Sequence, residues 1–209
     1  MMKNLIIIGA GGMGRTIYGL AMESLGYGAE YVIKGFIDDN IHSLDGFSGY
    51  PPVLGTISGY EPQTDDVFIS SIGGQSRMKC IEIIQEKGGS FINIIHSTAR
   101  VRNNVKLGIG NIVCAYAIIG VDCTIGNFNL FQNFAVIGHD VKMGNHNRID
   151  THVTCVGGVT ICNFTNIYTA AIINHGVTVE DYANVGAGSF VIRRVKAGTT
   201  VYGNPAKRL

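Results

Sequence analysis

Residues 117–143 read AIIGVDCTIGNFNLFQNFAVIGHDVKM, and in this stretch an apolar residue recurs at every sixth position. The spacing continues in both directions through sixteen hexads without an insertion. Neither an α-helix nor an ordinary strand has a period of six. A triangular solenoid does, because each hexad forms one flat side and one corner, and three hexads form one coil. We therefore predict a left-handed parallel β-helix with this apolar column in its interior: Val101, Leu107, Val113, Ile119, Ile125, Phe131, Ile137, Met143, Ile149, Cys155, Ile161, Ile167, Ile173, Val179, Val185 and Val191.

A second column lies two positions earlier in each hexad and holds small or β-branched residues and asparagine, from Ala99 to Val153. Such residues suit a tight position beside the interior. Several glycines follow the aliphatic column directly, and we expect them at the corners, where a positive φ favours glycine. These glycines are Gly108, Gly120, Gly126, Gly138, Gly144 and Gly186.

Residues 4–96 have a different pattern, in which strand-like and helix-like stretches alternate. Buried strands are predicted at residues 4–9, 31–37, 67–72 and 91–95, and helices at 15–25 and 76–87. Residues 40–65 are rich in Gly, Pro and Ser and are predicted to form a loop, with a short strand at residues 52–54. This alternation predicts a small parallel sheet with helices on both faces. The expected domains are a Rossmann-like domain at 1–96 and the β-helix with its C-terminal tail at 97–209.

Composition excludes several classes of protein. The chain of 209 residues is 46% hydrophobic, yet it has no run of eighteen apolar residues, so no membrane span is expected. The first residues lack the length and cleavage site of a signal peptide, which favours the cytoplasm. The formal net charge is +1 without a basic stripe, which argues against a nucleic-acid partner. The five cysteines are scattered and lack C-x-x-C spacing, so we expect reduced, mostly buried thiols.

The eighteen-residue coil brings distant residues together. Residues eighteen apart lie on the same side of adjacent coils, roughly 4.8 Å apart. His139 is therefore predicted beside Gly157, with His175 one coil further on. Asp140 follows His139 directly, and a carboxylate beside an imidazole orients it and raises its basicity, as a general base requires. A glycine one coil away can present a backbone N–H to a developing oxyanion. A histidine and a glycine that merely shape a turn are the alternative.

The loop after the first predicted strand, Gly9 to Gly14, satisfies the pattern G-x-G-x-x-G and opens a helix. Its backbone N–H groups can cradle a phosphate. Asp38 and Asp39 end the next strand, where a carboxylate can bind a ribose or a base. Because this half has room for only one mononucleotide-binding unit, we favour a nucleotide-linked ligand over a dinucleotide such as NAD.

These motifs and the C-terminal tail, residues 203–208 (GNPAKR), together resemble the bacterial nucleotide-sugar and sialic-acid acyltransferases. That group includes the UDP-4-amino-sugar N-acetyltransferases of surface-glycan synthesis and the sialic acid O-acetyltransferase-like proteins, all with hexapeptide repeats. The resemblance covers essentially the whole chain. It implies a homotrimer, acetyl-CoA as co-substrate in a groove between neighbouring solenoids, no metal, and transfer of an acetyl group to an amine or hydroxyl of a nucleotide-linked amino sugar or sialic acid.

The resemblance also implies roles for individual residues. His139 stands at the position of the general base, Asp140 at that of its acidic partner, and Gly157 at that of the amide that meets the thioester carbonyl. Thr169 and Ala187 match positions whose backbone binds the CoA arm. The nucleotide sugar is expected to contact the following residues: Gly11, Gly12, Met13, Asp38, Asp39 and Gly73.

Arg148 departs from the pattern of the family. It occupies a position near the CoA thiol where relatives often carry a second histidine. Arginine cannot act as a base, but it can bind a phosphate or a carboxylate. The identity of the acceptor and the length of the acyl group therefore stay open.

Two other functions remain possible from the sequence. One is a zinc lyase of the γ-carbonic-anhydrase type, which shares the solenoid; His139 and His175 fit its first two ligands, but Glu180 stands where its third histidine is required. The other is a non-catalytic scaffold that binds a nucleotide sugar. Metal analysis and a thiol-release assay separate these alternatives from acetyl transfer.

Overall fold

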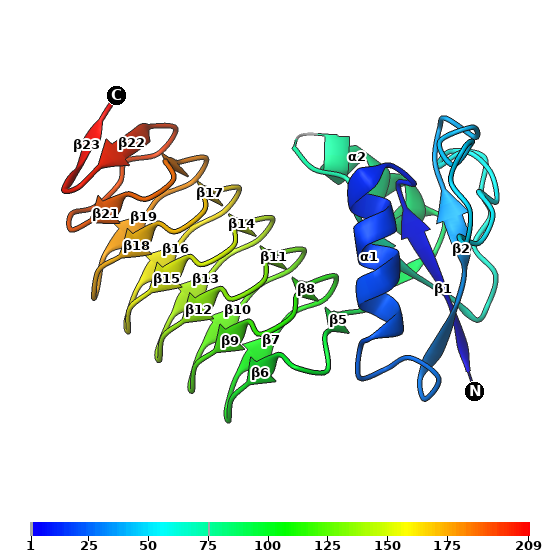
Figure 1. Ribbon diagram of the computed structural model, residues 1–209, viewed down its shortest axis with the longest axis horizontal. Coiled ribbons are helices and arrows are strands. Elements are labelled where there is room, and N and C mark those ends of the chain that lie inside the picture. Colours follow the sequence, from blue (N-terminus) through cyan, green and yellow to red (C-terminus); the bar gives the residue numbers. More distant parts are fainter. Residues whose placement is uncertain (1, 75) are drawn as a thin grey trace. The chain divides into compact units, whose positions relative to one another are not determined.

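The computed structural model describes residues 2–74 and 76–209, which form two compact units, Met1–Ile95 and His96–Leu209. Figure 1 shows a small α/β unit in blue to cyan and a stack of coils in green to red. Among the described residues, neither helix has the length and apolar character that crossing a membrane requires.

The N-terminal unit is built on a parallel sheet with the strand order β2-β1-β3-β4. Helix α1 packs on β1 and β2, and α2 packs on β3. Strand β1 is central, and its residues Leu5 to Ile8 are fully buried, as expected of a strand covered on both faces. The elements of this unit are β1 (Lys3–Ile8), α1 (Gly12–Met22), β2 (Tyr31–Ile37), β3 (Asp66–Ser70), α2 (Ser76–Glu86), β4 (Ser90–Phe91) and β5 (Ile94–Ile95).

The first helix begins and ends three residues earlier than the predicted range 15–25. Gly11 is its N-cap, and the Arg15 N–H donates to the Gly11 carbonyl at 3.0 Å, so the end of the glycine loop is already helical. A Cβ at Gly14 would collide with the Gly9 carbonyl, which explains a glycine inside a helix. Leu25, counted in the apolar side of the predicted helix, is 67% exposed and lies beyond it.

Two further boundaries differ from the prediction. The fourth predicted strand, residues 91–95, is split, and only Ser90–Phe91 continues the N-terminal sheet. The short strand predicted at residues 52–54 is a single bridge in which Val53 pairs with Phe36 of β2. The Phe36 N–H donates to the Pro52 carbonyl at 3.0 Å, and the Leu54 N–H donates to the Phe36 carbonyl at 2.7 Å.

The C-terminal unit is a left-handed parallel β-helix, as the hexads predict. Sixteen strands of two residues each follow one another from β6 to β21, and each pairs with the strand eighteen residues away. The second residue of each strand belongs to the predicted aliphatic column, and from Val113 to Val191 every member of that column is buried. The strands form three parallel sheets, one on each side of the prism (Figure 1).

We number the sheets in chain order. The first sheet contains β6 (Arg100–Val101), β9 (Ile118–Ile119), β12 (Val136–Ile137), β15 (Thr154–Cys155), β18 (Ile172–Ile173) and β21 (Phe190–Val191). The second contains β7 (Lys106–Leu107), β10 (Thr124–Ile125), β13 (Lys142–Met143), β16 (Thr160–Ile161) and β19 (Thr178–Val179). The C-terminal unit contributes seven strands to the third sheet: β8 (Ile112–Val113), β11 (Leu130–Phe131), β14 (Arg148–Ile149), β17 (Asn166–Ile167), β20 (Asn184–Val185), β22 (Thr200–Gly203) and the antiparallel β23 (Ala206–Arg208).

Close packing between coils, and not a positive φ, explains the glycines that the sequence analysis placed at the corners. None of the six has a positive φ; a Cβ at Gly120, for example, would lie 2.6 Å from the Gly138 carbonyl of the next coil. These glycines therefore allow coils to approach closely. The left-handed conformation falls two residues later in the hexad, at positions such as Phe128 (φ 56°) and Asp140 (φ 58°).

Candidate active site

His139 and Asp140 form the corner that follows β12. The left-handed backbone at Asp140 turns the chain toward β13, and the Asp140 N–H donates to the Val121 carbonyl at 3.0 Å. His139 Nδ1 lies 2.7 Å from Asp140 Oδ2, and their side chains are 59% and 64% exposed. Because an ionised carboxylate only accepts hydrogen bonds, this contact places the imidazole proton on Nδ1 and leaves Nε2 as the basic nitrogen.

Gly157 lies one coil above His139, where the eighteen-residue count places it. A Cβ built on Gly157 would overlap the imidazole of His139, with Nε2 as the nearest atom. The coils are joined here because the Gly158 N–H donates to the His139 carbonyl at 2.9 Å. In the described part of the chain, no acceptor meets the Gly157 N–H itself. The corner thus combines a basic nitrogen, an unpaired amide and the space that a missing side chain leaves.

His175 follows on the same corner one coil further on, where Gly158 separates it from the His139 pair. A Cβ on Gly158 would lie 3.5 Å from His175 Cε1. Within residues 2–74 and 76–209, no three His, Cys, Asp or Glu side chains gather as a metal site would require. The zinc alternative therefore has no ligand set within the described part of one chain.

The residues predicted for CoA lie elsewhere on the prism. Thr169 and Ala187 are one coil apart at the corner that follows the third sheet, where the Gly188 N–H donates to the Thr169 carbonyl at 2.9 Å. Arg148 begins β14 on that sheet, and its Nε donates to Asp150 Oδ1 at 2.6 Å. The first sheet separates their corner from the corner of His139. Within one chain, therefore, the predicted base and the predicted CoA residues occupy different corners.

The predicted sugar-nucleotide residues share one edge of the N-terminal sheet. Gly11, Gly12 and Met13 follow β1, while Gly73 follows β3, the neighbouring strand. Cβ atoms on these three glycines would meet nothing within 4 Å, so the backbone there is open to an approaching ligand. The N-cap Gly11 offers no side-chain hydrogen bond to the first turn of α1, which leaves those N–H groups for an anion.

Asp38 and Asp39, after β2, support the same edge through the backbone. Asp38 Oδ2 accepts the Ala10 N–H at 2.7 Å, which ties it to the glycine loop. Asp39 Oδ1 accepts the Ile57 N–H at 3.0 Å. The sequence motif predicted the position of these carboxylates. It did not predict that each accepts a hydrogen bond from a backbone N–H of a loop.

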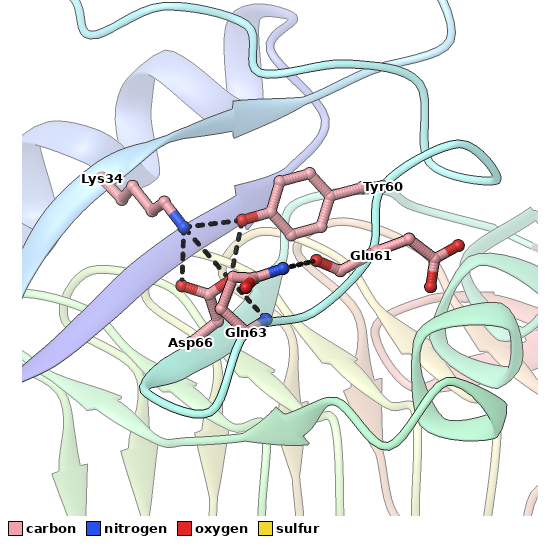
Figure 2. A network of polar contacts seen from close by, with 5 residues as sticks. All are labelled: Lys34, Tyr60, Glu61, Gln63 and Asp66. Atoms are coloured by element: carbon pink, nitrogen blue, oxygen red, sulfur yellow. Dashed lines mark hydrogen bonds and ion pairs between the residues drawn. The ribbon is translucent and has the colours of Figure 1, made fainter.

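A second polar cluster, which the sequence analysis did not predict, lies at the other end of this sheet. Asp66, at the start of β3, has a fully buried side chain and accepts from Lys34 Nζ at 2.9 Å, from the Tyr60 hydroxyl at 2.7 Å and from the Gln63 N–H at 2.9 Å (Figure 2). Burial raises the pKa of Asp66, but the Gln63 amide, Lys34 and Tyr60 outweigh it and hold that pKa below its ordinary value. The cluster fixes the end of the long loop to the sheet.

Comparisons with known proteins agree with this architecture. Residues 4–84 match the PglD N-terminal domain family. No curated protein matches the sequence of the chain. Among solved structures, PerB from Caulobacter crescentus, in complex with CoA and GDP-perosamine, is 26% identical, with 100% of this chain and 98% of that chain covered and a TM-score of 0.88.

Two more solved structures match along the whole chain. The acetyltransferase domain of PglB from Neisseria gonorrhoeae, in complex with acetyl coenzyme A, is 27% identical, with 100% of both chains covered and a TM-score of 0.89. WeeI from Acinetobacter baumannii shares the fold at 23% identity, with 100% of both chains covered and a TM-score of 0.86. Residues 4–84 therefore resemble the PglD N-terminal domain family, and the chain is an acyltransferase with hexapeptide repeats.

Proposed function

We propose that the protein transfers the acetyl group of acetyl-CoA to the amine of a nucleotide-linked amino sugar in the cytoplasm, as a step of surface-glycan synthesis. The observation that carries this proposal is the 2.7 Å contact of His139 Nδ1 with Asp140, which leaves Nε2 free beside Gly157. The relatives support the substrate class, because PerB was solved with CoA and GDP-perosamine and the PglB domain with acetyl coenzyme A.

The proposed reaction is a direct transfer. The acceptor nitrogen attacks the thioester carbonyl and forms the C–N bond while His139 Nε2 takes its proton. The Gly157 N–H donates to the oxyanion of the tetrahedral intermediate. The intermediate then collapses, the C–S bond breaks, and the CoA thiolate leaves and takes up the proton from His139. Asp140 stabilises the imidazolium between these two steps.

The remaining predicted residues complete the proposal. Arg148, Thr169 and Ala187 bind acetyl-CoA, and Gly11, Gly12, Met13, Asp38, Asp39 and Gly73 bind the nucleotide sugar. Because the base and the CoA residues lie at different corners of one prism, a homotrimer with active sites between subunits brings them together.

A thiol-release screen tests the proposal directly. Purified protein is incubated with acetyl-CoA and with UDP- or dTDP-linked amino sugars or sialic acid, and free CoA is measured. We expect turnover with an amino-sugar nucleotide, whereas sialic acid as the only acceptor would indicate O-acetylation. Binding of a nucleotide sugar without thiol release from any acceptor would favour the scaffold alternative.

The catalytic role of His139 has its own test. His139→Ala is expected to lower kcat by a factor of about 10²–10⁴, since the general base is lost. The matched control is His152→Asn at another corner, where φ is 61° and asparagine tolerates a left-handed backbone. Near-normal turnover of His139→Ala would reject the assignment, as would an equal loss in His152→Asn.

A further inference from the structure

A polar cluster lies on the outer face of the third sheet, around Arg148. The cluster consists of Arg148, Asp150, Gln132 and Tyr168. Because residues eighteen apart are neighbours, Gln132, Asp150 and Tyr168 form one column on three successive coils, each directly after a strand of the sheet. Arg148, the first residue of β14, lies two residues before Asp150. The other outward residues of this sheet that flank Arg148 are uncharged: Leu130 and Asn166.

Asp150 holds the arginine in a fixed orientation. Its side chain is only 7% exposed, and a buried carboxylate requires hydrogen-bond partners. Oδ1 receives two donors, Arg148 Nε at 2.6 Å and Gln132 Nε2 at 2.8 Å. Gln132 is oriented in turn, because its Oε1 accepts from the Thr151 hydroxyl at 3.3 Å. The carboxylate is therefore part of a chain of hydrogen bonds that ends on the guanidinium.

The rest of the guanidinium is available to a ligand. The Tyr168 ring of the next coil flanks it, with Arg148 Cζ 5.9 Å from the ring centroid. The Arg148 side chain is 46% exposed, and in the described residues neither Nη1 nor Nη2 has a protein partner. A guanidinium held at Nε still presents parallel N–H donors at its outer edge, and this geometry matches the two oxygens of a carboxylate or phosphate.

We propose that Arg148 is an oxyanion-binding site for a substrate of this enzyme, and that Asp150 acts as its positioning residue. The ligand is a carboxylate group, and it binds in a fork on Nη1 and Nη2. The inference deepens the proposed acetyl transfer, on which it rests for the choice of substrate. Two sources carry this chemistry near the CoA thiol: a carboxylate at the end of a longer acyl group, and the carboxylate of a sialic acid acceptor.

Binding measurements by calorimetry test the site and separate the sources. The probes are CoA, acetyl-CoA, succinyl-CoA and sialic acid, each titrated into the full-length protein. Arg148→Gln is expected to weaken binding of the probe that carries the bound oxyanion by about 10- to 100-fold, the effect of a charged hydrogen bond. If succinyl-CoA loses its higher affinity relative to acetyl-CoA, the oxyanion is the acyl carboxylate. If the loss is confined to sialic acid, the oxyanion is the carboxylate of the acceptor.

Two control variants distinguish the loss of bidentate binding by Arg148 from the loss of a positive charge and from a general effect of substitution. Lys142→Gln removes one exposed positive charge on the second sheet and should leave every affinity within about twofold of the wild type. Arg148→Lys keeps the charge but loses the fork, so it should recover little of the lost affinity. Full recovery in Arg148→Lys would overturn the forked geometry.

The role of Asp150 requires a double-mutant cycle. Asp150→Asn alone should weaken the same probe as Arg148→Gln does. In the Arg148→Gln background it should cause no further loss, because a positioning residue acts only through the residue it positions. A separate, additive loss in the double variant would overturn the positioning role. Thermal unfolding of each variant checks that the solenoid is intact.

The outcomes also separate this inference from the proposed function. If Arg148→Gln and Lys142→Gln bind all probes as the wild type does while thiol release continues, the oxyanion site is wrong and the transferase stands. If CoA fails to bind but sialic acid binds through Arg148, the proposed acetyl transfer is wrong and the site stands. A wild type that binds none of the probes overturns both.

Discussion

At the scale of the residue, the candidate site depends on an absence of side-chain atoms beside a histidine. The backbone conformation at residue 157 does not require a glycine, because its φ is not positive. The space that it leaves is occupied by the imidazole of His139. The identity of residue 157 therefore controls the orientation of a side chain that lies eighteen positions earlier in the sequence.

Gly157→Ala should reduce activity without unfolding the protein. The added methyl group displaces the His139 ring, and a displacement of about 1 Å from the reacting atoms can lower the rate about 100-fold. The measurement is kcat by thiol release together with the thermal unfolding temperature. Gly19→Ala, which adds a methyl group on α1 where nothing lies within 4 Å, is the control. Unchanged kcat in Gly157→Ala would show that the ring is not held where the structure places it.

At the scale of the element, buried amides join successive coils. Asn111, Asn129 and Asn147 lie in the small-residue column and are almost fully buried. The Asn129 N–H donates to Asn111 Oδ1 at 2.9 Å, its Nδ2 donates to the Gly144 carbonyl at 3.0 Å, and its Oδ1 accepts the Asn147 N–H at 2.9 Å. The Asn129 side chain thus satisfies two backbone groups of the next coil, and the Asn111 side chain satisfies the backbone N–H of Asn129.

Asn129→Ala should destabilise the β-helix by about 2–4 kcal/mol, because it leaves a buried carbonyl and a buried N–H without partners. Urea unfolding of the C-terminal unit measures the change. Asn103→Ala is the matched control, since Asn103 is exposed and should change stability by less than about 0.5 kcal/mol. Equal effects of the two substitutions would contradict the structural role of the amide column.

The Lys34–Tyr60–Asp66 cluster predicts an acid-sensitive N-terminal unit. The pKa of Asp66 is lowered in the folded protein, so its contribution is fully present above the unfolded value of about 3.9 and is lost as the pH falls through the lower folded value. Asp66→Asn should cost about 3 kcal/mol at pH 7, because it breaks a buried ion pair. The difference from the wild type should shrink below about pH 4 when unfolding is followed against pH. A difference that stays constant down to pH 2 would contradict the lowered pKa.

At the scale of the whole molecule, the first sheet presents an apolar outer column to solvent in the single chain. Its outward residues include Ile118, Val136, Ile172 and Phe190, and Ile172 is 41% exposed. Apolar surface of this kind, interrupted here by Thr154 between Val136 and Ile172, marks contact sites between proteins. This surface adjoins the corner of His139, so an association through it would cover the candidate site.

We predict that the protein sediments as a trimer, at about three times the 22.4 kDa mass of the chain. Phe190→Lys on the outer face of β21 should weaken this association, because it places a charge in an apolar contact. The control is Thr178→Lys on the second sheet, which should sediment as the wild type does. A monomer at micromolar concentration would contradict the trimer.

Much of this architecture follows from the sequence, because six residues form one side of the prism and eighteen residues form one coil. The strand positions from β6 to β21 and the neighbourhood of His139 and Gly157 follow from counting in sixes and eighteens. The first helix was misplaced because apolar spacing cannot show that a glycine loop is already helical at Gly12. The partners of Asp66 and Asp150 could not be predicted, because Lys34 lies in another strand and Gln132 in another coil, and side-chain hydrogen bonds of that kind have no period.

The eighteen-residue coil also limits how such a gene can change in length. An insertion of six codons below His139 would turn every later residue to the next side of the prism, so each stacked pair across the insertion would be broken. An insertion of eighteen codons would restore all stacked positions and lengthen the molecule by one coil. The stretch between His139 and Gly157 tolerates neither change, because a whole extra coil there would part the imidazole from the glycine. We therefore expect natural length variation in this fold to come in multiples of eighteen residues and to avoid that interval.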